Sequence, residues 1–407
     1  MNILVSAFAC CPNKGSEFGV GWNWIVSLSS YCCIHAIVEK SQKSAIEEAL
    51  CNLAHNENLF FYYVELESCA WKMYYNQGDW RFYYYYHKWQ KKVFVKALEI
   101  CRNNAIDIAH QLDLICFREP GYFSQLGIPY VWGPIGGVAF YPDGYKSSLR
   151  FSERIKFSIK KFISLIQLKY SHRVKLSAQQ SRIILGTSNG IIQYFSKIYK
   201  TPIVHEPEVG CNYTDFVHVF PKDKFSILWV GRFIPSKQLD LALHIVSQLK
   251  YFPDIEFHIV GDGHNKAEYL KLAQKMRISD KCHWHGNIPI QDVHQLMKSS
   301  SLLLFTSLVE ATATVVTEAL TYRLPIICFD TCGFGQLLSN DCAVKIPLSN
   351  FDSSVHDFST VIGDLYYNRE KLVYMAAKID PILQSQDWKV KARRIFEYYK
   401  QILNSKQ

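Results

Sequence analysis

Short apolar runs alternate along this chain with longer stretches in which apolar residues recur every three or four positions. Short runs bounded by glycine or charged residues predict buried strands, and the longer stretches predict helices between them. Strands are expected at residues 3–8, 106–109, 225–230, 255–260 and 302–305. The first strand is followed by a glycine-containing loop and then by a helix over about 22–30. Strands and helices that alternate in this way are typical of α/β folds with parallel sheets.

The chain is long enough for two domains. Its 407 residues exceed the size, about 250–300 residues, at which one hydrophobic core stops growing. Prolines interrupt the periodicity between residues 201 and 220, which places a domain boundary there. Residues 388–403 form a final amphipathic helical pattern.

Charged residues follow successive strands in the second half. Gly231 and Arg232 end the strand 225–230, Lys237 comes shortly afterwards, and Gly263 closes a Gly-Asp-Gly turn after the next strand. Open parallel sheets bind ligands at the carboxyl ends of their strands, so these residues are candidates for a ligand site. The Gly-x-Gly turn alone is a weak signal, because such turns are common after buried strands.

Two acids are separated by seven residues after the run 302–305. Glu310 falls where the strand gives way to a helix, and Glu318 lies about two turns into that helix at ~3.6 residues per turn. One acid can bind a sugar and the other a nucleoside, with the N–H groups of the helix start available to a phosphate between them. Spacing alone is equally compatible with two solvated acids on a helix surface.

Together these motifs resemble those of the family-4 retaining glycosyltransferases. The amino-terminal half agrees, with Gly15 before Ser-Glu, His110 at a later strand end, and Trp-Gly-Pro-Ile-Gly-Gly at 132–137. The resemblance implies an α/β fold of the GT-B type, with two Rossmann-like domains whose parallel sheets face across a cleft. The acceptor-side domain would comprise residues 1–205 plus about 386–407, and the nucleotide-sugar domain residues 206–385.

The resemblance also implies catalytic roles. Arg232 and Lys237 would stabilise the charge that develops on the departing diphosphate. Glu310 would hold hydroxyls of the donor sugar, and His110 would reach that sugar from the other domain. Transfer would retain the anomeric configuration and need no metal or other cofactor, and the chain contains no Asp-x-Asp of the kind that metal-using transferases often carry.

A second set of residues is expected to bind the donor. As an ionised carboxylate, Glu318 would accept hydrogen bonds from the ribose hydroxyls of a UDP- or GDP-linked sugar. The rest of the expected set is Gly15, Gly231, Gly263, Ile290, and the backbone N–H groups of Ala313 and Thr314.

Basic charge is concentrated in one segment. Residues 144–182 contain ten Lys or Arg and a single acidic residue, Glu153. The net charge of this segment, +9, equals the formal net charge of the whole chain. Apolar residues lie between them at partly helical spacing, so Lys156, Lys160 and Lys161 are candidates for contact with anionic lipid or a lipid-linked acceptor. No helix-turn-helix, zinc-finger or RNA-binding signature accompanies the charge, so nucleic acid is not the expected partner.

The expected location is the cytoplasm, peripheral to the inner face of the plasma membrane, with a role in surface polysaccharide synthesis. The 13 cysteines include no Cys-x-x-Cys pair, which fits reduced thiols and no zinc site. Oligomeric state, donor sugar and acceptor have no readable signature in the sequence.

Three departures from the family pattern leave alternatives open. Gln238 and Arg323 stand where the family usually has glycine, and Ala311 with Thr312 replaces the residues common after the first acid. A positive φ at Arg323 would be strained. A catalytically weak homologue that binds a nucleotide sugar or glycan therefore remains possible, as does a GT-B-like nucleotide-sugar epimerase.

Overall fold

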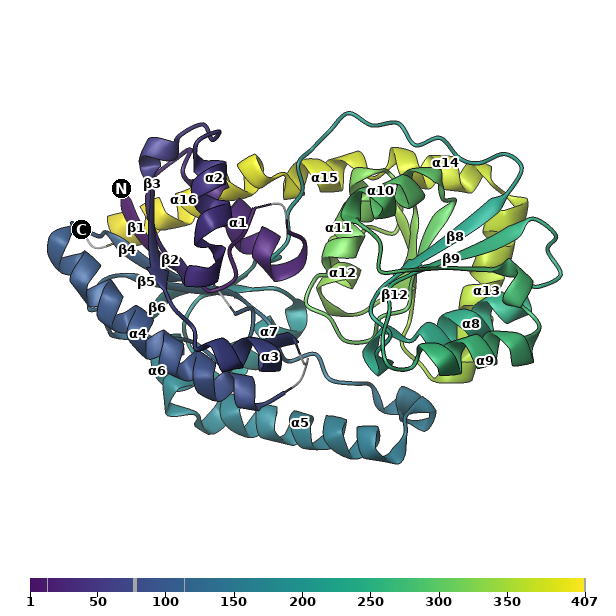
Figure 1. Ribbon diagram of the computed structural model, residues 1–407, viewed down its shortest axis with the longest axis horizontal. Helices are drawn as coiled ribbons and strands as arrows, with labels where there is room; N and C mark the ends of the chain where they lie inside the picture. The colour runs from purple at the N-terminus through teal and green to yellow at the C-terminus, as the bar shows by residue number, and fades with distance from the viewer. Residues whose placement is uncertain (13, 76–78, 113, 406–407) are drawn as a thin grey trace. The chain divides into compact units, whose positions relative to one another are not determined.

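The computed structural model describes residues 1–12, 14–75, 79–112 and 114–405. The chain forms two compact units, each with its own parallel sheet (Figure 1). The first unit contains Met1–Val138, Phe162–Gly210 and Trp388–Gln407, and the second contains Ala139–Lys161 and Cys211–Asp387.

One segment lies in a different unit from the one expected. The segment Ala139–Lys161 belongs to the second unit, although the sequence assigned it to the first. Tyr141, Tyr145 and Leu149 are buried in the core of the second unit, and the hydroxyl groups of Tyr145 and Ser354 are 2.6 Å apart. Burial of these three apolar side chains explains the assignment.

The first unit is a doubly wound α/β structure. Its seven strands pair in the order β3-β2-β1-β4-β5-β6-β7, and every pair is parallel. The strands are β1 (Asn2–Ala7), β2 (Cys33–Glu39), β3 (Leu59–Val64), β4 (Ile108–Gln111), β5 (Tyr130–Ile135), β6 (Ser181–Gly186) and β7 (Ile203–His205). The helices are α1 (Ser16–Leu28), α2 (Lys43–Leu50), α3 (Ser68–Tyr75), α4 (Arg81–Asn103), α6 (His172–Gln180), α7 (Asn189–Ile198) and α16 (Trp388–Asn404).

Helix α1 begins earlier than predicted. Gly19 and Gly21 lie inside it, whereas the sequence placed them in a loop. A Cβ atom on Gly19 would come within 2.1 Å of the Lys14 carbonyl oxygen, and one on Gly21 within 2.0 Å of the Ala9 carbonyl oxygen. These glycines therefore allow close packing of the helix against the chain before it, and they do not form an anion-binding loop.

The second unit has the same kind of architecture with six strands. They pair in parallel in the order β10-β9-β8-β11-β12-β13. The strands are β8 (Phe225–Val230), β9 (Ile255–Val260), β10 (Cys282–Gly286), β11 (Leu302–Phe305), β12 (Ile326–Phe329) and β13 (Ala343–Ile346). The helices are α8 (Leu239–Gln248), α9 (Lys266–Met276), α10 (Ile290–Ser299), α11 (Thr314–Thr321), α12 (Cys332–Leu337), α13 (Phe351–Tyr367), α14 (Glu370–Ala377) and α15 (Asp380–Gln386).

Both faces of the second sheet are buried, which explains why its strands are continuous apolar runs. Leu302 and Leu304 of β11 pack into one core cluster, while Leu303 and Phe305 pack into another on the opposite face. Strands buried on both faces are typical of parallel sheets covered by helices on both sides.

The helix α5 (Phe151–Tyr170) contains the boundary between the two units, which falls between Lys161 and Phe162. All thirteen cysteines are free thiols. In the part of the chain that the structure describes, no helix is long and apolar enough to cross a membrane.

Candidate active site

The strand order of the second sheet reverses between β8 and β11, its two central strands. The chain runs outward from β8 through β9 to β10, and then returns to β11 on the other side of β8. Ligands of open α/β sheets bind at such a switch point, beyond the carboxyl ends of the strands. Lys237 lies after β8 and Glu310 after β11, and their side chains form an ion pair there.

The backbone of Lys237 is held by Thr306, the first residue after β11. The Thr306 hydroxyl donates a hydrogen bond to the Lys237 carbonyl oxygen at 2.8 Å and accepts one from the indole N–H of Trp229 at 3.0 Å. The Lys237 ammonium also lies 5.5 Å from the centre of the Phe305 ring. These contacts hold a mostly buried cation in one place at the mouth of the sheet.

The backbone around Glu310 is supported by the β12–α12 connection. The Glu310 N–H donates to the Sγ atom of Cys332 at 3.4 Å, and the Gly333 N–H donates to the Ala311 carbonyl oxygen at 2.8 Å. The sequence pattern gives Cys332 no predicted role in a ligand site. Only the three-dimensional meeting of two loops reveals it, because no spacing in the sequence links it to Glu310.

Arg232 lies on a loop that packs tightly against the next strand end. A Cβ atom on Gly261 would come within 1.9 Å of the Gly231 carbonyl oxygen, and the Phe233 N–H donates to the Asp262 carbonyl oxygen at 2.9 Å. Gly263 equally has no room for a side chain, because its Cβ atom would lie 2.8 Å from that of Phe233. The glycines thus position the exposed Arg232 beside a second loop.

Glu318 lies on α11 as predicted, but about one turn into the helix instead of two, because α11 begins only at Thr314. Burial raises the pKa of its carboxyl group to about 7. Among the described residues, no side chain or backbone group forms a hydrogen bond or ion pair with this carboxylate. A largely buried polar group without a protein partner is unusual, and hydroxyl groups of a ligand would satisfy it.

The start of α11 has an unusual backbone. Ala313, the residue before the helix, has φ 80° and ψ 115°, a conformation that costs about 1–3 kcal/mol for a residue with a side chain. The first N–H groups of the helix, beginning with Thr314, have no acceptor within the helix itself. This strained start therefore presents N–H donors near the loop that carries Glu310.

Two other candidates lie elsewhere. Ile290 begins α10 after the edge strand β10, which β9 separates from β8, and its side chain is exposed. Gly15 precedes α1 in the first unit, where its φ of −79° does not require glycine and its missing Cβ faces open space. Ile290 therefore does not lie on either of the loops that carry Lys237 and Glu310, and Gly15 belongs to the other unit.

The predicted orientation of His110 is wrong. The residue lies in β4, but its ring is fully buried instead of projecting from the strand end. Its Nδ1 atom lies 2.5 Å from the Tyr399 hydroxyl and its Nε2 atom 2.6 Å from the Gly133 carbonyl oxygen. Burial lowers the pKa of His110 to about 4, so the ring is neutral. Because both ring nitrogens are engaged inside the first unit, His110 positions α16 there and is not arranged to contact a sugar.

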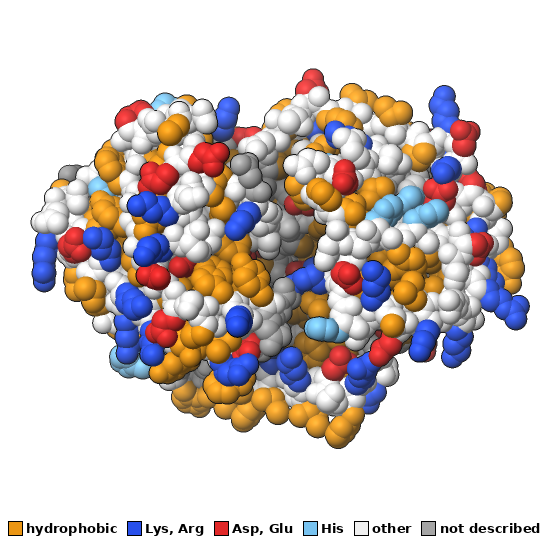
Figure 2. All heavy atoms as spheres, viewed as in Figure 1, with side chains coloured by type: hydrophobic (Ala, Val, Ile, Leu, Met, Phe, Trp, Pro, Cys, Tyr) orange, Lys and Arg blue, Asp and Glu red, His pale blue; other side chains and the backbone are white. Residues whose placement is uncertain are grey.

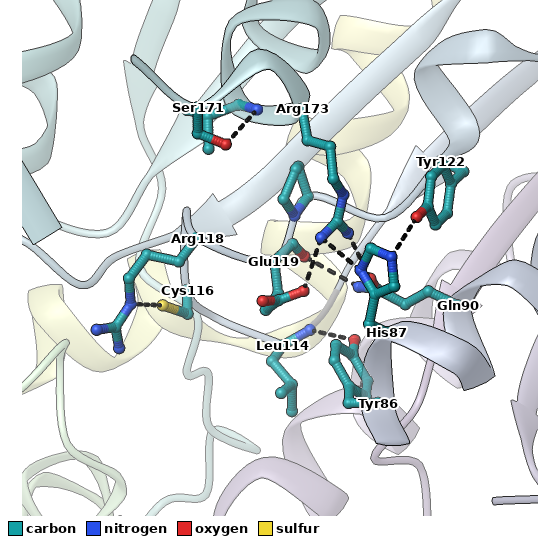
Figure 3. A network of polar contacts seen from close by, with 12 residues as sticks. Tyr86, His87, Gln90, Leu114, Cys116, Arg118, Glu119, Tyr122, Ser171 and Arg173 are labelled. Carbon is teal, nitrogen blue, oxygen red and sulfur yellow. Dashed lines mark hydrogen bonds and ion pairs between the residues drawn. The ribbon is translucent and has the colours of Figure 1, made fainter. Parts of the chain in front are cut away.

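The first unit contains a separate polar network, shown in Figure 3, that joins α4, α6 and the chain after β4. Arg173 donates to the Gln90 side-chain oxygen at 2.6 Å and pairs with Glu119 at 3.2 Å, and it lies 2.8 Å from Nδ1 of His87. Arg173 belongs to the basic segment singled out in the sequence, yet it points inward. Part of that segment is therefore structural.

The departures from the family pattern are built into the fold. Gln238 and Arg323 both have positive φ, of 54° and 50°. The Gln238 side chain donates to the Tyr141 hydroxyl at 2.6 Å, and the Arg323 guanidinium contacts Asp380 at 2.7 Å and covers the Tyr213 ring. In each case, local contacts of the side chain stabilise a backbone conformation that glycine would adopt without strain.

Two Rossmann-like parallel sheets within one chain define the GT-B class of glycosyltransferase folds. Sucrose-phosphate synthase from Thermosynechococcus elongatus has a similar structure, with a TM-score of 0.68 and 13% identity over 99% of both chains. Anabaena HepE, solved with UDP-glucose, has a TM-score of 0.60 at 13% identity over 98% of this chain and 100% of that one. Both likenesses establish the fold.

The sequence of the second unit matches a family model. Residues 213–372 match the model of the glycosyl transferases group 1, which agrees with the resemblance that the sequence motifs indicate. The phosphatidylinositol N-acetylglucosaminyltransferase GPI3 subunit of Saccharomyces cerevisiae is 25% identical over 182 residues, which are 44% of this chain and 40% of that protein. The matched part therefore spans less than half of the relative's length.

Proposed function

We propose that this chain is a retaining glycosyltransferase that moves a sugar from a UDP- or GDP-linked donor to a glycan or lipid-linked oligosaccharide. The observation that carries the proposal is the meeting of Lys237 and Glu310 at the switch point of the second sheet. Glu318 follows on α11, and Arg232 lies on the loop from the neighbouring strand. HepE was solved with UDP-glucose, which supports a nucleotide sugar as the donor.

The chemistry follows from the charge of the leaving group. Cleavage of the bond between sugar and diphosphate leaves negative charge on the distal phosphate, and fixed cations stabilise that charge as it develops. Lys237 and Arg232 supply cations, and the start of α11 supplies N–H donors. Glu310 would hold sugar hydroxyls and Glu318 the ribose hydroxyls. With these groups in place, transfer needs no metal ion.

Nucleotide release, measured with and without a glycan acceptor over a panel of UDP- and GDP-sugars, tests this function. We expect release that depends on acceptor, together with a product whose mass has increased by one sugar residue. Isomerised donor formed without acceptor would instead identify an epimerase. Donor binding with neither reaction would identify a binding protein, and either of these results would overturn the proposal.

The acceptor is proposed to lie at an anionic membrane surface, because α5 carries a row of exposed apolar side chains. Seven large apolar residues on this helix are exposed, and most of them are separated by three or four residues. They are Phe151, Ile155, Ile159, Phe162, Ile163, Ile166 and Tyr170. Lys156 and Lys160 are also exposed, while Lys161 is half-buried beside Phe140. Figure 2 shows apolar and basic atoms together along this helix.

Apolar residues flanked by lysines are typical of helices that lie in the membrane interface. Each basic residue near an anionic bilayer contributes about 1 kcal/mol. The relative GPI3 is named as a subunit of phosphatidylinositol N-acetylglucosaminyltransferase, which supports a lipid acceptor. Liposome sedimentation should show binding to anionic vesicles that is lost in Lys156→Glu/Lys160→Glu and in Ile159→Ser/Phe162→Ser. The control Lys271→Glu/Lys378→Glu alters charge equally on exposed residues of α9 and the α14 end. Equal pelleting of all variants would refute the membrane proposal.

A further inference from the structure

Three histidines and a glutamate gather on the edge of the second sheet, on β9 and β10. Glu256 and His258 alternate along β9 with Phe257, which faces the core, so both lie on the opposite face of the strand. His283 of β10 is paired with His258 in the parallel register, and His285 follows two residues later. Histidine atoms are visible at the surface near β9 and α10 (Figure 2).

The spacing of the ring and carboxylate atoms fits a bound cation. One ligand atom each from Glu256, His258 and His283 lies within 4.8 Å of the other two. The Nε2 atom of His258 is 3.4 Å from a carboxylate oxygen of Glu256. Two ligands of a tetrahedral zinc ion, with bonds of ~2.0–2.1 Å, are about 3.3–3.4 Å apart, whereas a good N–H···O hydrogen bond is ~2.9–3.0 Å. The observed distance is compatible with two ligands of one metal ion.

Neighbouring groups orient these ligands. The Nδ1 atom of His258 lies 3.0 Å from Nε2 of His285, and the Lys224 ammonium lies 2.6 Å from the other carboxylate oxygen of Glu256. Contacts of this kind to the outer atoms of metal ligands fix ring orientation in metal sites.

We propose that Glu256, His258 and His283 bind one late first-row divalent cation, with water completing its coordination. Imidazole and carboxylate ligands suit Zn²⁺, Ni²⁺ and Cu²⁺ better than Mg²⁺ or Ca²⁺, which prefer oxygen ligands alone. The site lies along the strands at the sheet edge, whereas Lys237 and Glu310 follow the ends of the two central strands. It is therefore a binding site additional to the proposed transfer site.

Titration calorimetry of the full chain with Zn²⁺ tests this site. We expect one ion per chain, with affinity reduced at least tenfold in His283→Ala and in Glu256→Gln. Because His283 is exposed and glutamine keeps the shape of glutamate, neither change should disturb the fold. His285→Ala, which removes an orienting contact, should weaken binding by about 10–100-fold. His356→Ala, an exposed histidine on α13, is the matched control and should bind as the wild type does.

Electron paramagnetic resonance with Cu²⁺ provides a readout of the ligand atoms themselves. Two imidazole nitrogens should split the signal of the wild type, and one should be lost in His283→Ala. The absence of stoichiometric Zn²⁺ binding would overturn the proposal. Binding that weakens equally in His356→Ala, or that is unchanged in His283→Ala and Glu256→Gln, would also overturn it.

Discussion

Each unit contains a carboxylate paired with basic side chains, but the two carboxylates differ in their exposure to solvent. In the first unit, Glu206 is fully buried and accepts hydrogen bonds from Lys391 at 2.6 Å and from two nitrogens of Arg394 at 2.7 Å. In the second unit, Glu310 pairs with Lys237 at the mouth of the sheet, and both side chains keep some exposure.

This difference in exposure distinguishes a structural ion-pair cluster around Glu206 from a candidate ligand site at Lys237 and Glu310. Burial raises the pKa of Glu206, but Lys391 and Arg394 outweigh it and hold the pKa below its usual value. All three charges are satisfied within the first unit, where they tie the start of α16 to the chain after β7. Lys237 and Glu310, by contrast, lie where parallel sheets bind ligands. We therefore expect changes at Glu206 to affect stability and changes at Lys237 to affect chemistry.

The largest expected effect is that of Glu206→Gln on stability. Loss of the anion leaves Lys391 buried without its counter-charge, which typically costs about 3–5 kcal/mol. Urea unfolding should show this loss, while Glu268→Gln, which breaks the exposed ion pair with Arg150, should cost less than about 1 kcal/mol. If both variants lost equally little free energy of unfolding, Glu206 could not be a buried structural anchor of the first unit.

Lys237→Ala should have the next largest effect, on turnover. Removal of one group that stabilises transition-state charge lowers kcat by about 10²–10³-fold, and Arg232→Ala should act in the same direction. KM should change less than kcat. Lys345→Ala removes a lysine of similar exposure on β13 and serves as the control, with thermal unfolding confirming that both variants fold. Wild-type turnover in Lys237→Ala would exclude the catalytic role.

Glu318 should give a pH signature in both stability and binding. Its pKa of about 7 exceeds the ordinary value of 4.5, so the folded protein binds the extra proton and loses stability as pH rises from about 4.5 to 7. Glu318→Gln should remove this loss and be more stable than the wild type at pH 8, by roughly 1–3 kcal/mol.

Donor binding should respond to pH in the opposite sense. The ionised form of Glu318 accepts the ribose hydroxyls, so affinity of the wild type for the nucleotide sugar should rise through pH 7 and that of Glu318→Gln should not. Calorimetry between pH 6 and 8 measures both. A flat wild-type profile would argue against the nucleoside role, even if the stability effect is found.

The smallest expected effect is that of Ala313→Gly. Relief of the strained φ of 80° should stabilise the second unit by about 1 kcal/mol. Thermal unfolding should show a small rise in Tm, with Ala319→Gly inside α11 as a control that should instead destabilise. A fall in Tm for Ala313→Gly would mean that the observed backbone is not strained.

The sequence predicted strands well where apolar runs are continuous, because burial on both sheet faces leaves no alternation to interpret. It also placed Lys237 and Glu310 after strand ends and Glu318 on a helix, since these are local properties, although Glu318 lies about one turn into α11 instead of two. It failed for His110, because a ring at a strand end can turn inward to a partner such as Tyr399, and that partner lies far along the sequence. The support of Glu310 by Cys332 was missed for the same reason.

The glycines of α1 show a second limit. A glycine can serve a turn, an anion-binding loop or close packing of a helix, and only the last applies to Gly19 and Gly21. Likewise, the basic composition of residues 144–182 was clear, but which side chains face solvent was not. Arg173 points inward to Glu119, whereas Lys156 and Lys160 are exposed.

The most direct test of the central claim is acceptor-dependent sugar transfer in EDTA, followed by addition of Mg²⁺, Mn²⁺ and Zn²⁺. If Lys237, Arg232 and the start of α11 supply the positive environment of the diphosphate, the wild type should keep nearly its full rate without divalent ions. Lys237→Ala should stay slow under every condition. Complete loss of transfer in EDTA, restored by Mn²⁺ or Mg²⁺ and unchanged by Glu256→Gln at the separate edge site, would contradict the claim that the protein's own charges suffice.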